Sequence, residues 1–190
     1  MSEPDTTLVS RARSGDHSAF EELVRRTSRL LFARLYLNTG CPNQAEDLLQ
    51  ETFLLAFRSL HQLKNPVGFR HWLLTLARNV GVDSARKAAR LKRLAPVTAD
   101  IPLGTIPAAG PSPDEAALRE ELRQQVLAVL RTLPEEYRLP ITLRYIVGVD
   151  CDDIGEHLGL TNSAVRSLLY RGLKVLRDRL PPDLKAEFEG

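Results

Sequence analysis

The chain has few of the residues from which disulfide frameworks and metal sites are built. It has two cysteines, Cys41 and Cys151, which are too few and too far apart for a disulfide framework or a zinc ligand set. The four histidines are scattered without ligand spacing, and glycine-rich phosphate loops, nucleophile motifs and paired-carboxylate motifs are absent. The composition therefore predicts neither an enzyme nor a protein that carries a metal or cofactor.

Long hydrophobic runs are also absent. No run approaches the roughly 20 apolar residues of a membrane-spanning helix, and the first sixteen residues lack the apolar core of a signal peptide. The hydrophobic content of 43% is ordinary for a globular protein, which excludes wholesale disorder. We therefore expect a folded protein that is not inserted in a membrane and that acts in the cytoplasm.

The pattern of apolar residues predicts an all-α fold with two small helical domains. Almost every segment has helical period, and no run alternates like a strand. Residues 95–112 differ, because they contain four prolines and one charged residue, which is typical of a linker. The predicted domains are therefore residues 1–94 and 113–190. Residues 1–94 have 15 Lys and Arg against 9 Asp and Glu, a net charge of +6, whereas residues 95–190 have 11 against 15, a net charge of −4.

Capping residues predict where several helices begin. Asp16 and Asp150 precede helical segments and can cap them. Asn43 and Thr132 each precede a glutamate by three residues, which is the spacing of a capping box. Pro140 lies inside the helix that follows Thr132 and predicts a kink, since proline removes one backbone hydrogen bond.

The segment from Asp153 to Leu180 has the pattern of a helix-turn-helix, in which a short helix, a turn at Gly159 and a longer helix follow one another. One face of the longer helix is apolar. The other face offers groups for base edges near its N-terminus and for phosphates further along. These candidate DNA contacts are Asn162, Ser163, Arg166, Ser167, Tyr170, Arg171 and Lys174. The alternative is a solvated basic face on an ordinary helix.

Two segments of the first domain carry further signals. Residues 45–60 (AEDLLQETFLLAFRSL) combine an apolar stripe with an acidic outer face, which suits a protein partner. Periodicity alone, however, favours a plain amphipathic core helix. Residues 69–93 place basic side chains beside aromatic ones, as suits single-stranded nucleic acid. Trp72 itself is better explained as a core residue. The basic cluster from Arg86 to Arg93 fits either a phosphate-contacting surface or a solvated helix end that complements the helix dipole.

Taken together, these segments resemble the extracytoplasmic-function (ECF) group of bacterial sigma factors, the small two-domain members of the sigma-70 family. Residues 45–60 are similar to the segment that binds core RNA polymerase. Residues 69–87 (FRHWLLTLARNVGVDSARK) look like the helix that melts the promoter and reads the minus-ten element. Residues 133–172 resemble the domain that reads the minus-thirty-five element. The likeness covers nearly the whole chain.

The resemblance implies a sigma factor that directs core RNA polymerase to specific promoters and assists promoter melting, with no enzymatic activity of its own. It implies polymerase contacts at Asp47, Leu48, Gln50, Glu51 and Leu54. It places the minus-ten element and the melted strand against His61, Gln62, Leu63, Lys64, Asn65, Arg70, Arg78, Asn79 and Arg86. The segment from Asp153 to Gly172 would read the minus-thirty-five element. The expected partners are the β and β′ subunits of core polymerase, duplex and melted promoter DNA, and the anti-sigma factor with which such proteins often act.

The chain departs from the family pattern at Leu168, where Arg is usual, and at Ala164, where Thr is common. Two other functions fit part of the sequence: a helix-turn-helix regulator that binds duplex DNA without polymerase, and an interaction protein whose N-terminal helices only dock a partner. The first domain discriminates, because a plain regulator needs neither the basic helix around Trp72 nor the surface on residues 45–60. We also expect a closed free form, since tethered domains of opposite net charge attract each other.

Overall fold

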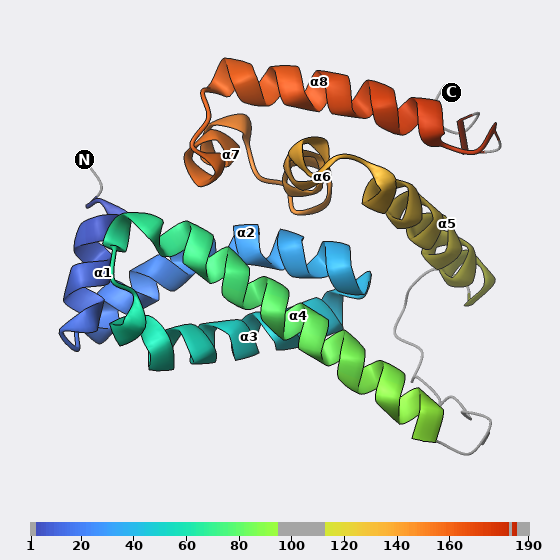
Figure 1. Cartoon of the computed structure of the whole chain (residues 1–190). Helices are drawn as coiled ribbons and strands as arrows, with labels where there is room; N and C mark the ends of the chain where they lie inside the picture. Colours follow the sequence, from blue (N-terminus) through green and yellow to red (C-terminus); the bar gives the residue numbers. More distant parts are fainter. Residues whose placement is uncertain (1–2, 95–112, 183, 186–190) are drawn as a thin grey trace.

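The computed structural model describes residues 3–94, 113–182, 184 and 185 (Figure 1). The part it describes is helical and contains no strand, which confirms the all-α fold class. The first domain holds α1 (Asp5–Arg13), α2 (His17–Thr39), α3 (Pro42–Ser59) and α4 (Phe69–Leu94), with short 3₁₀ turns η1 (Leu60–Gln62) and η2 (Pro66–Gly68). The second holds α5 (Pro113–Thr132), α6 (Glu135–Ile141), the π-helical turn η3 (Thr142–Ile146), α7 (Cys151–Leu158) and α8 (Asn162–Arg179). The predicted linker, residues 95–112, lies outside the described residues.

The first domain is a bundle in which α2 packs against α1, α3 and α4. Its apolar stripe is fully buried at Leu23, Leu30 and Leu31, and Phe69 and Leu73 of α4 lie in the same core. Burying a leucine or phenylalanine side chain stabilises the fold by about 1.5–3 kcal/mol. This core holds α3 and α4 in place and leaves their other faces available to solvent.

The helix boundaries of the first domain follow from local chemistry. Asp16 caps α2, since its carboxylate accepts a hydrogen bond from the Ala19 N–H at 3.2 Å, and Gly40 ends α2 with a left-handed φ of 73°. The prediction that Asn43 opens α3 was wrong: the helix begins at Pro42 and Cys41 is its N-cap, without a side-chain capping bond. Proline is favoured at the first helical position because its missing N–H is not needed there.

In the second domain, α6 and α7 pack against α8. The prediction that Thr132 opens a helix was wrong, because Thr132 closes α5 and its hydroxyl donates to the Val129 carbonyl, while α6 begins at Glu135 after Pro134. The expected disturbance at Pro140 takes the form of η3, which directly follows α6 and ends with a hydrogen bond from Val147 N–H to Thr142 O at 3.1 Å. A π-helical turn relaxes the ladder that the proline interrupts.

The helix-turn-helix forms as the sequence predicts. Asp150 caps α7 by accepting from Asp153 N–H at 2.8 Å, and Gly159 makes the turn with a φ of 68°. Thr161 then caps α8 by accepting from Ala164 N–H at 3.2 Å. At Gly172 an added Cβ would lie 2.9 Å from atoms of Tyr137 and Ile141, so α8 crosses α6 without an intervening side chain.

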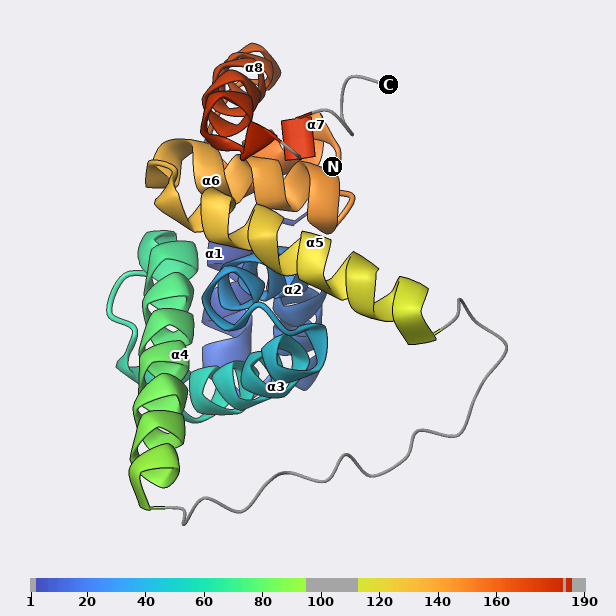
Figure 2. The ribbon, with the colours of Figure 1, turned by 90° about the vertical axis from the view of Figure 1, so that its right-hand side faces the viewer.

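The two domains are in contact. Figure 2 shows α5 crossing in front of α2, and the buried residues of the two domains belong to one continuous cluster. Leu127 and Leu130 of α5 are fully buried in it. The second domain therefore packs against the first at the C-terminal end of α2.

Candidate functional site

The outer face of α8 carries the side chains that the sequence assigned to duplex DNA. Val165 and Leu169 are buried on the inner face, so the opposite side of the helix points to solvent. Asn162 is half-buried and its amide donates to the Asp152 carboxylate. The other candidates are exposed: Ser163, Arg166, Ser167, Tyr170, Arg171 and Lys174. Leu168 is half-buried. One helix face thus presents hydroxyl, phenol, guanidinium and ammonium groups together, which suits base edges and phosphates.

The outer face of α3 carries the predicted polymerase contacts. Asp47, Gln50, Glu51 and Leu54 are exposed, and Leu54 is 58% exposed. The same face has a groove of about 390 Å³ lined by Phe20, Gln50, Phe53, Leu54 and Phe57. An exposed apolar groove of this kind is typical of a protein-binding surface.

Phe57 belongs to this surface. Its side chain is 46% exposed, and its ring stacks on His17 at 5.5 Å and meets Phe20 edge-on at 5.1 Å between centroids. Leu54 and Phe57 lie three residues apart, on the side of α3 that faces away from the buried residues Ala45, Leu48 and Ala56.

Two of the predicted contact residues are corrected by their burial. Leu48 is 5% exposed and Leu63 is 8% exposed, and both lie in the hydrophobic core. A side chain so placed packs within the bundle and offers no surface to polymerase or DNA. Leu48 anchors α3, and Leu63 anchors the loop between α3 and α4.

The loop between α3 and α4 presents the other predicted minus-ten residues to solvent. His61, Gln62, Lys64 and Asn65 are exposed. The Asn65 carboxamide also accepts a hydrogen bond from Val67 N–H at 3.0 Å, which fixes the turn before α4. Further along α4, the exposed residues Arg78, Asn79 and Arg86 extend this polar surface. Trp72 is half-buried and packs beside Phe69, in agreement with a core role.

Arg70 is held by the second domain. Its Nε donates to Asp5 Oδ2 at 2.8 Å, and its two terminal nitrogens donate to the Glu156 backbone carbonyl at 2.6 Å and to Glu156 Oε1 at 3.2 Å. His157 Nδ1 lies 3.4 Å from the same guanidinium. Burial, and after it the charge of Arg70, hold the pKa of His157 below its ordinary value. Asp5, Glu156 and His157 had no signal in the sequence, because contacts between domains leave no local pattern.

A second set of contacts joins α5 and α6 to the C-terminal end of α2. Arg131 donates from Nε to the Leu37 carbonyl at 2.7 Å and from Nη2 to the Asn38 carbonyl at 3.1 Å. Arg123 donates to the Tyr36 hydroxyl and lies 5.6 Å from the Tyr36 ring centroid. The last carbonyls of a helix lack partners within it and carry partial negative charge, so arginines are well suited to this end of α2.

No helix in the described part of the chain is long and apolar enough to cross a membrane. Among the same residues, no group of three or more His, Cys, Asp and Glu side chains is arranged to hold a metal ion.

Comparison with known proteins identifies both domains. Residues 23–91 match the family model of sigma-70 region 2, and residues 123–176 match that of sigma-70 region 4. The ECF RNA polymerase sigma factor SigE of Mycolicibacterium smegmatis is 35% identical over 182 residues, which cover 94% of this chain and 68% of that protein. The ECF RNA polymerase sigma-E factor of Haemophilus influenzae is 29% identical, covering 94% of this chain and 96% of the other. The solved structure of CnrH in complex with the cytosolic domain of CnrY aligns with 90% of this chain and 94% of that one at 25% identity and a TM-score of 0.48.

The chain therefore combines the two domains of a transcription initiation factor. The chain belongs to the ECF sigma factors of the sigma-70 family. It directs RNA polymerase to promoter DNA. This identification excludes the two other functions that fitted part of the sequence.

Proposed function

We propose that the two domains divide promoter recognition between them. Residues 1–94 bind core polymerase and the minus-ten element, residues 113–190 read the minus-thirty-five element, and residues 95–112 tether the two. The protein contributes no enzymatic activity of its own and acts in the cytoplasm, where it meets core polymerase. An anti-sigma factor is the further expected partner.

Polymerase binds at the outer face of α3 through Asp47, Gln50, Glu51 and Leu54. The groove beside Leu54 supports this assignment, since Leu54 and Phe57 expose large apolar side chains that a partner would remove from water. Asp47 and Glu51 form the acidic rim of the same surface, which gives the interface its charge preference.

Promoter DNA binds at two places. The exposed loop and helix residues that meet the minus-ten element and the melted strand are His61, Gln62, Lys64, Asn65, Arg78, Asn79 and Arg86. Arg70, which pairs with Asp5 and Glu156 in the docked form, is a further member of this set. The outer face of α8 lies in the major groove of the minus-thirty-five element, with Arg166 and Arg171 at base edges and Lys174 at a phosphate.

The observation that carries this proposal is the placement of α3 and α8 at opposite sides of the molecule (Figures 1 and 2). A protein partner on α3 and duplex DNA on α8 can therefore be held at the same time. A protein with the helix-turn-helix alone would bind DNA but would lack a separate surface for polymerase.

Run-off transcription with purified core polymerase and a promoter library tests the proposal. We expect Asp47→Lys to weaken binding to core polymerase on the order of tenfold, because the reversal places a positive charge in an acidic rim. The matched control is Glu121→Lys, the same charge reversal at an exposed residue of α5 outside these surfaces. Unchanged polymerase affinity in Asp47→Lys, or an equal loss in Glu121→Lys, would contradict the assignment.

A further inference from the structure

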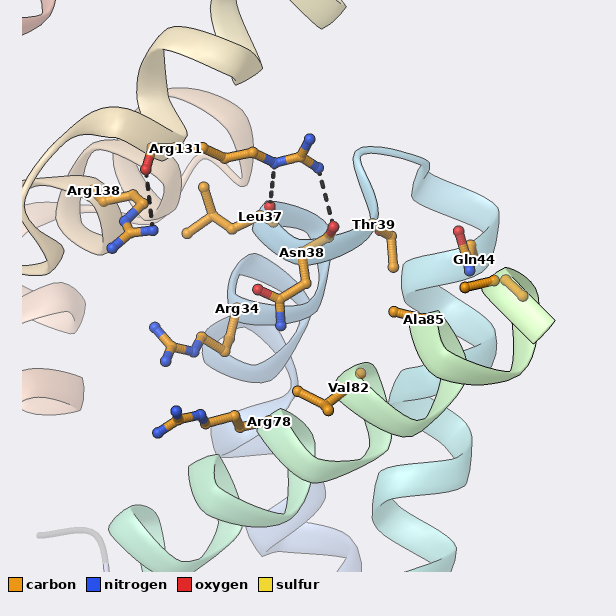
Figure 3. Close-up of a pocket in the computed structure, with 13 residues that line it drawn as sticks. Arg34, Leu37, Asn38, Thr39, Gln44, Arg78, Val82, Ala85, Arg131 and Arg138 are labelled. Carbon is orange, nitrogen blue, oxygen red and sulfur yellow. Dashed lines mark hydrogen bonds between the residues drawn. The ribbon is translucent and has the colours of Figure 1, made fainter. Parts of the chain in front are cut away.

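A cleft lies between the two domains, at the end of α2 (Figure 3). It has a volume of about 750 Å³ and is bounded by α2, α4, α5 and α6, with Gln44 of α3 at one end. Its apolar wall includes Leu37, Val82 and Ala85. This volume falls within the range of small-molecule sites, about 300–1,000 Å³.

The charged groups of the cleft are all of one sign. Arg34 and Arg78 come from the first domain, and Arg131 and Arg138 come from the second. The residues that line it include no Asp or Glu within the described part of the chain. Glu135 pairs with Arg34 and so offsets one of the four charges. A cleft lined by one sign of charge focuses the potential and concentrates counter-ions.

The arginines retain donors for a ligand. Arg34 and Arg78 point the same way from α2 and α4 in Figure 3, and the Glu135 carboxylate pairs with Arg34 alone. Arg131 uses two of its N–H groups on the Leu37 and Asn38 carbonyls. Arg138 donates from Nη1 to the Arg131 carbonyl at 3.4 Å, while its buried Nε has no hydrogen-bond partner among the described residues.

We propose that this cleft binds a small molecule that carries a chain of phosphates. Guanidinium groups recognise phosphate oxygens bidentately, and a chain of phosphates carries enough charge to engage arginines from both walls. In a nucleotide, the base would lie on the apolar wall. Because two arginines come from each domain, the ligand binds only when the domains are docked. It therefore stabilises the closed form by mass action and opposes separation of the two domains.

This inference goes beyond the proposed function. It depends on the docked arrangement, on Arg34, which is assigned to neither polymerase nor DNA, and on Arg78, which the proposed function also places beside the melted strand. Its failure would leave the assignment of α3 and α8 intact, and a failure of that assignment would leave the cleft unchanged.

Equilibrium binding of a fluorescent ATP analogue to the full-length chain tests it. Displacement by ATP, by inorganic tripolyphosphate and by AMP separates the sources of the phosphate chain. We expect both ATP and tripolyphosphate to displace the probe and AMP to bind about tenfold more weakly, since a single phosphate reaches fewer arginines. Displacement by ATP at much lower concentration than tripolyphosphate would assign the site to nucleotides, and the reverse order would assign it to inorganic polyphosphate.

Variants locate the site. Arg34→Gln and Arg78→Gln should each weaken binding by about tenfold through the loss of charge-assisted hydrogen bonds. Arg29→Gln is the matched control, because Arg29 is an exposed arginine of α2 that does not line the cleft. Arg78 is exposed, so its substitution preserves the fold even if Arg34→Gln does not.

Domain separation provides an independent readout. The two cysteines of the chain, Cys41 and Cys151, lie one in each domain and accept a donor and an acceptor dye. ATP or tripolyphosphate should raise energy transfer between them. The proposal is overturned if neither compound binds, if Arg29→Gln weakens binding as much as Arg34→Gln, if transfer does not rise, or if only a single-stranded oligonucleotide binds with this arginine dependence.

Discussion

Arg131 provides the sharpest test of how the two domains are held together. We expect Arg131→Met to shift the free protein toward an open form, because methionine keeps the apolar length of the side chain and loses both hydrogen bonds to the end of α2. Arg131 is an exposed residue, so each bond is discounted for solvent to about 0.5–1.5 kcal/mol. Two such bonds contribute about 1–3 kcal/mol, which corresponds to a change of roughly 5- to 150-fold in the ratio of closed to open molecules.

Energy transfer between dyes on Cys41 and Cys151 measures that ratio directly, and small-angle scattering measures the overall size. Both are recorded in buffer without phosphate compounds, so that only the contacts of the chain itself are tested. Arg119→Met is the matched control, since Arg119 is an exposed arginine of the same helix that makes no hydrogen bond to α2 among the described residues. Equal transfer in wild type and Arg131→Met, or an equal fall in Arg119→Met, would refute the reasoning.

Two further predictions concern His157 and α8. In the closed form, burial and then the charge of Arg70 lower the pKa of His157, while Asp5, Asp153 and Glu156 oppose this shift. The imidazole of His157 is therefore protonated less readily in the closed form than in the open form. The closed form is therefore fully stable above the ordinary histidine pKa of about 6.5 and loses stability as the pH drops below that value. Energy transfer between the dyes should decline on acidification, and His157→Asn should remove the part of this decline that His157 causes. On α8, loss of Arg166 or Arg171 should weaken DNA binding by about 1–3 kcal/mol and reduce the base specificity at one position of the site. Lys174→Ala should instead reduce by about one the slope of log binding constant against log salt concentration. Titration of the polymerase holoenzyme with promoter variants at several salt concentrations separates these two outcomes, and an unchanged salt slope in Lys174→Ala would remove Lys174 from the phosphate contacts.

Features that depend on neighbouring residues in the chain could be predicted from the sequence. The caps at Asp16 and Asp150 and the turn at Gly159 involve atoms only a few residues apart, so their chemistry is visible locally. The predicted helix starts at Asn43 and Thr132 were wrong because the nearby prolines Pro42 and Pro134 set where each helix begins.

The contacts between domains could not be predicted residue by residue. The opposite net charges of the domains favour a docked form but do not say which residues meet. The contact of Arg70 with Glu156 and that of Arg131 with the end of α2 each join positions more than 80 residues apart. The burial of Leu48 and Leu63 likewise depends on which face of each segment the rest of the bundle covers. The resemblance to a family supplies the roles of surfaces, whereas only packing decides which side chains reach them.

The close approach of α8 to α6 at Gly172 has a consequence for the way promoter preference can diverge. The inner face of α8 holds the helix in place through Val165, Leu169 and the close contact of Gly172 with Tyr137 and Ile141, without help from the side chains on its outer face. Outward residues such as Arg166, Ser167 and Arg171 can therefore be substituted without changing how α8 packs on α6. Duplicated copies of such a gene could acquire different target sequences through a few outward substitutions, and the same property makes this helix a convenient place to build sigma factors that ignore one another's promoters.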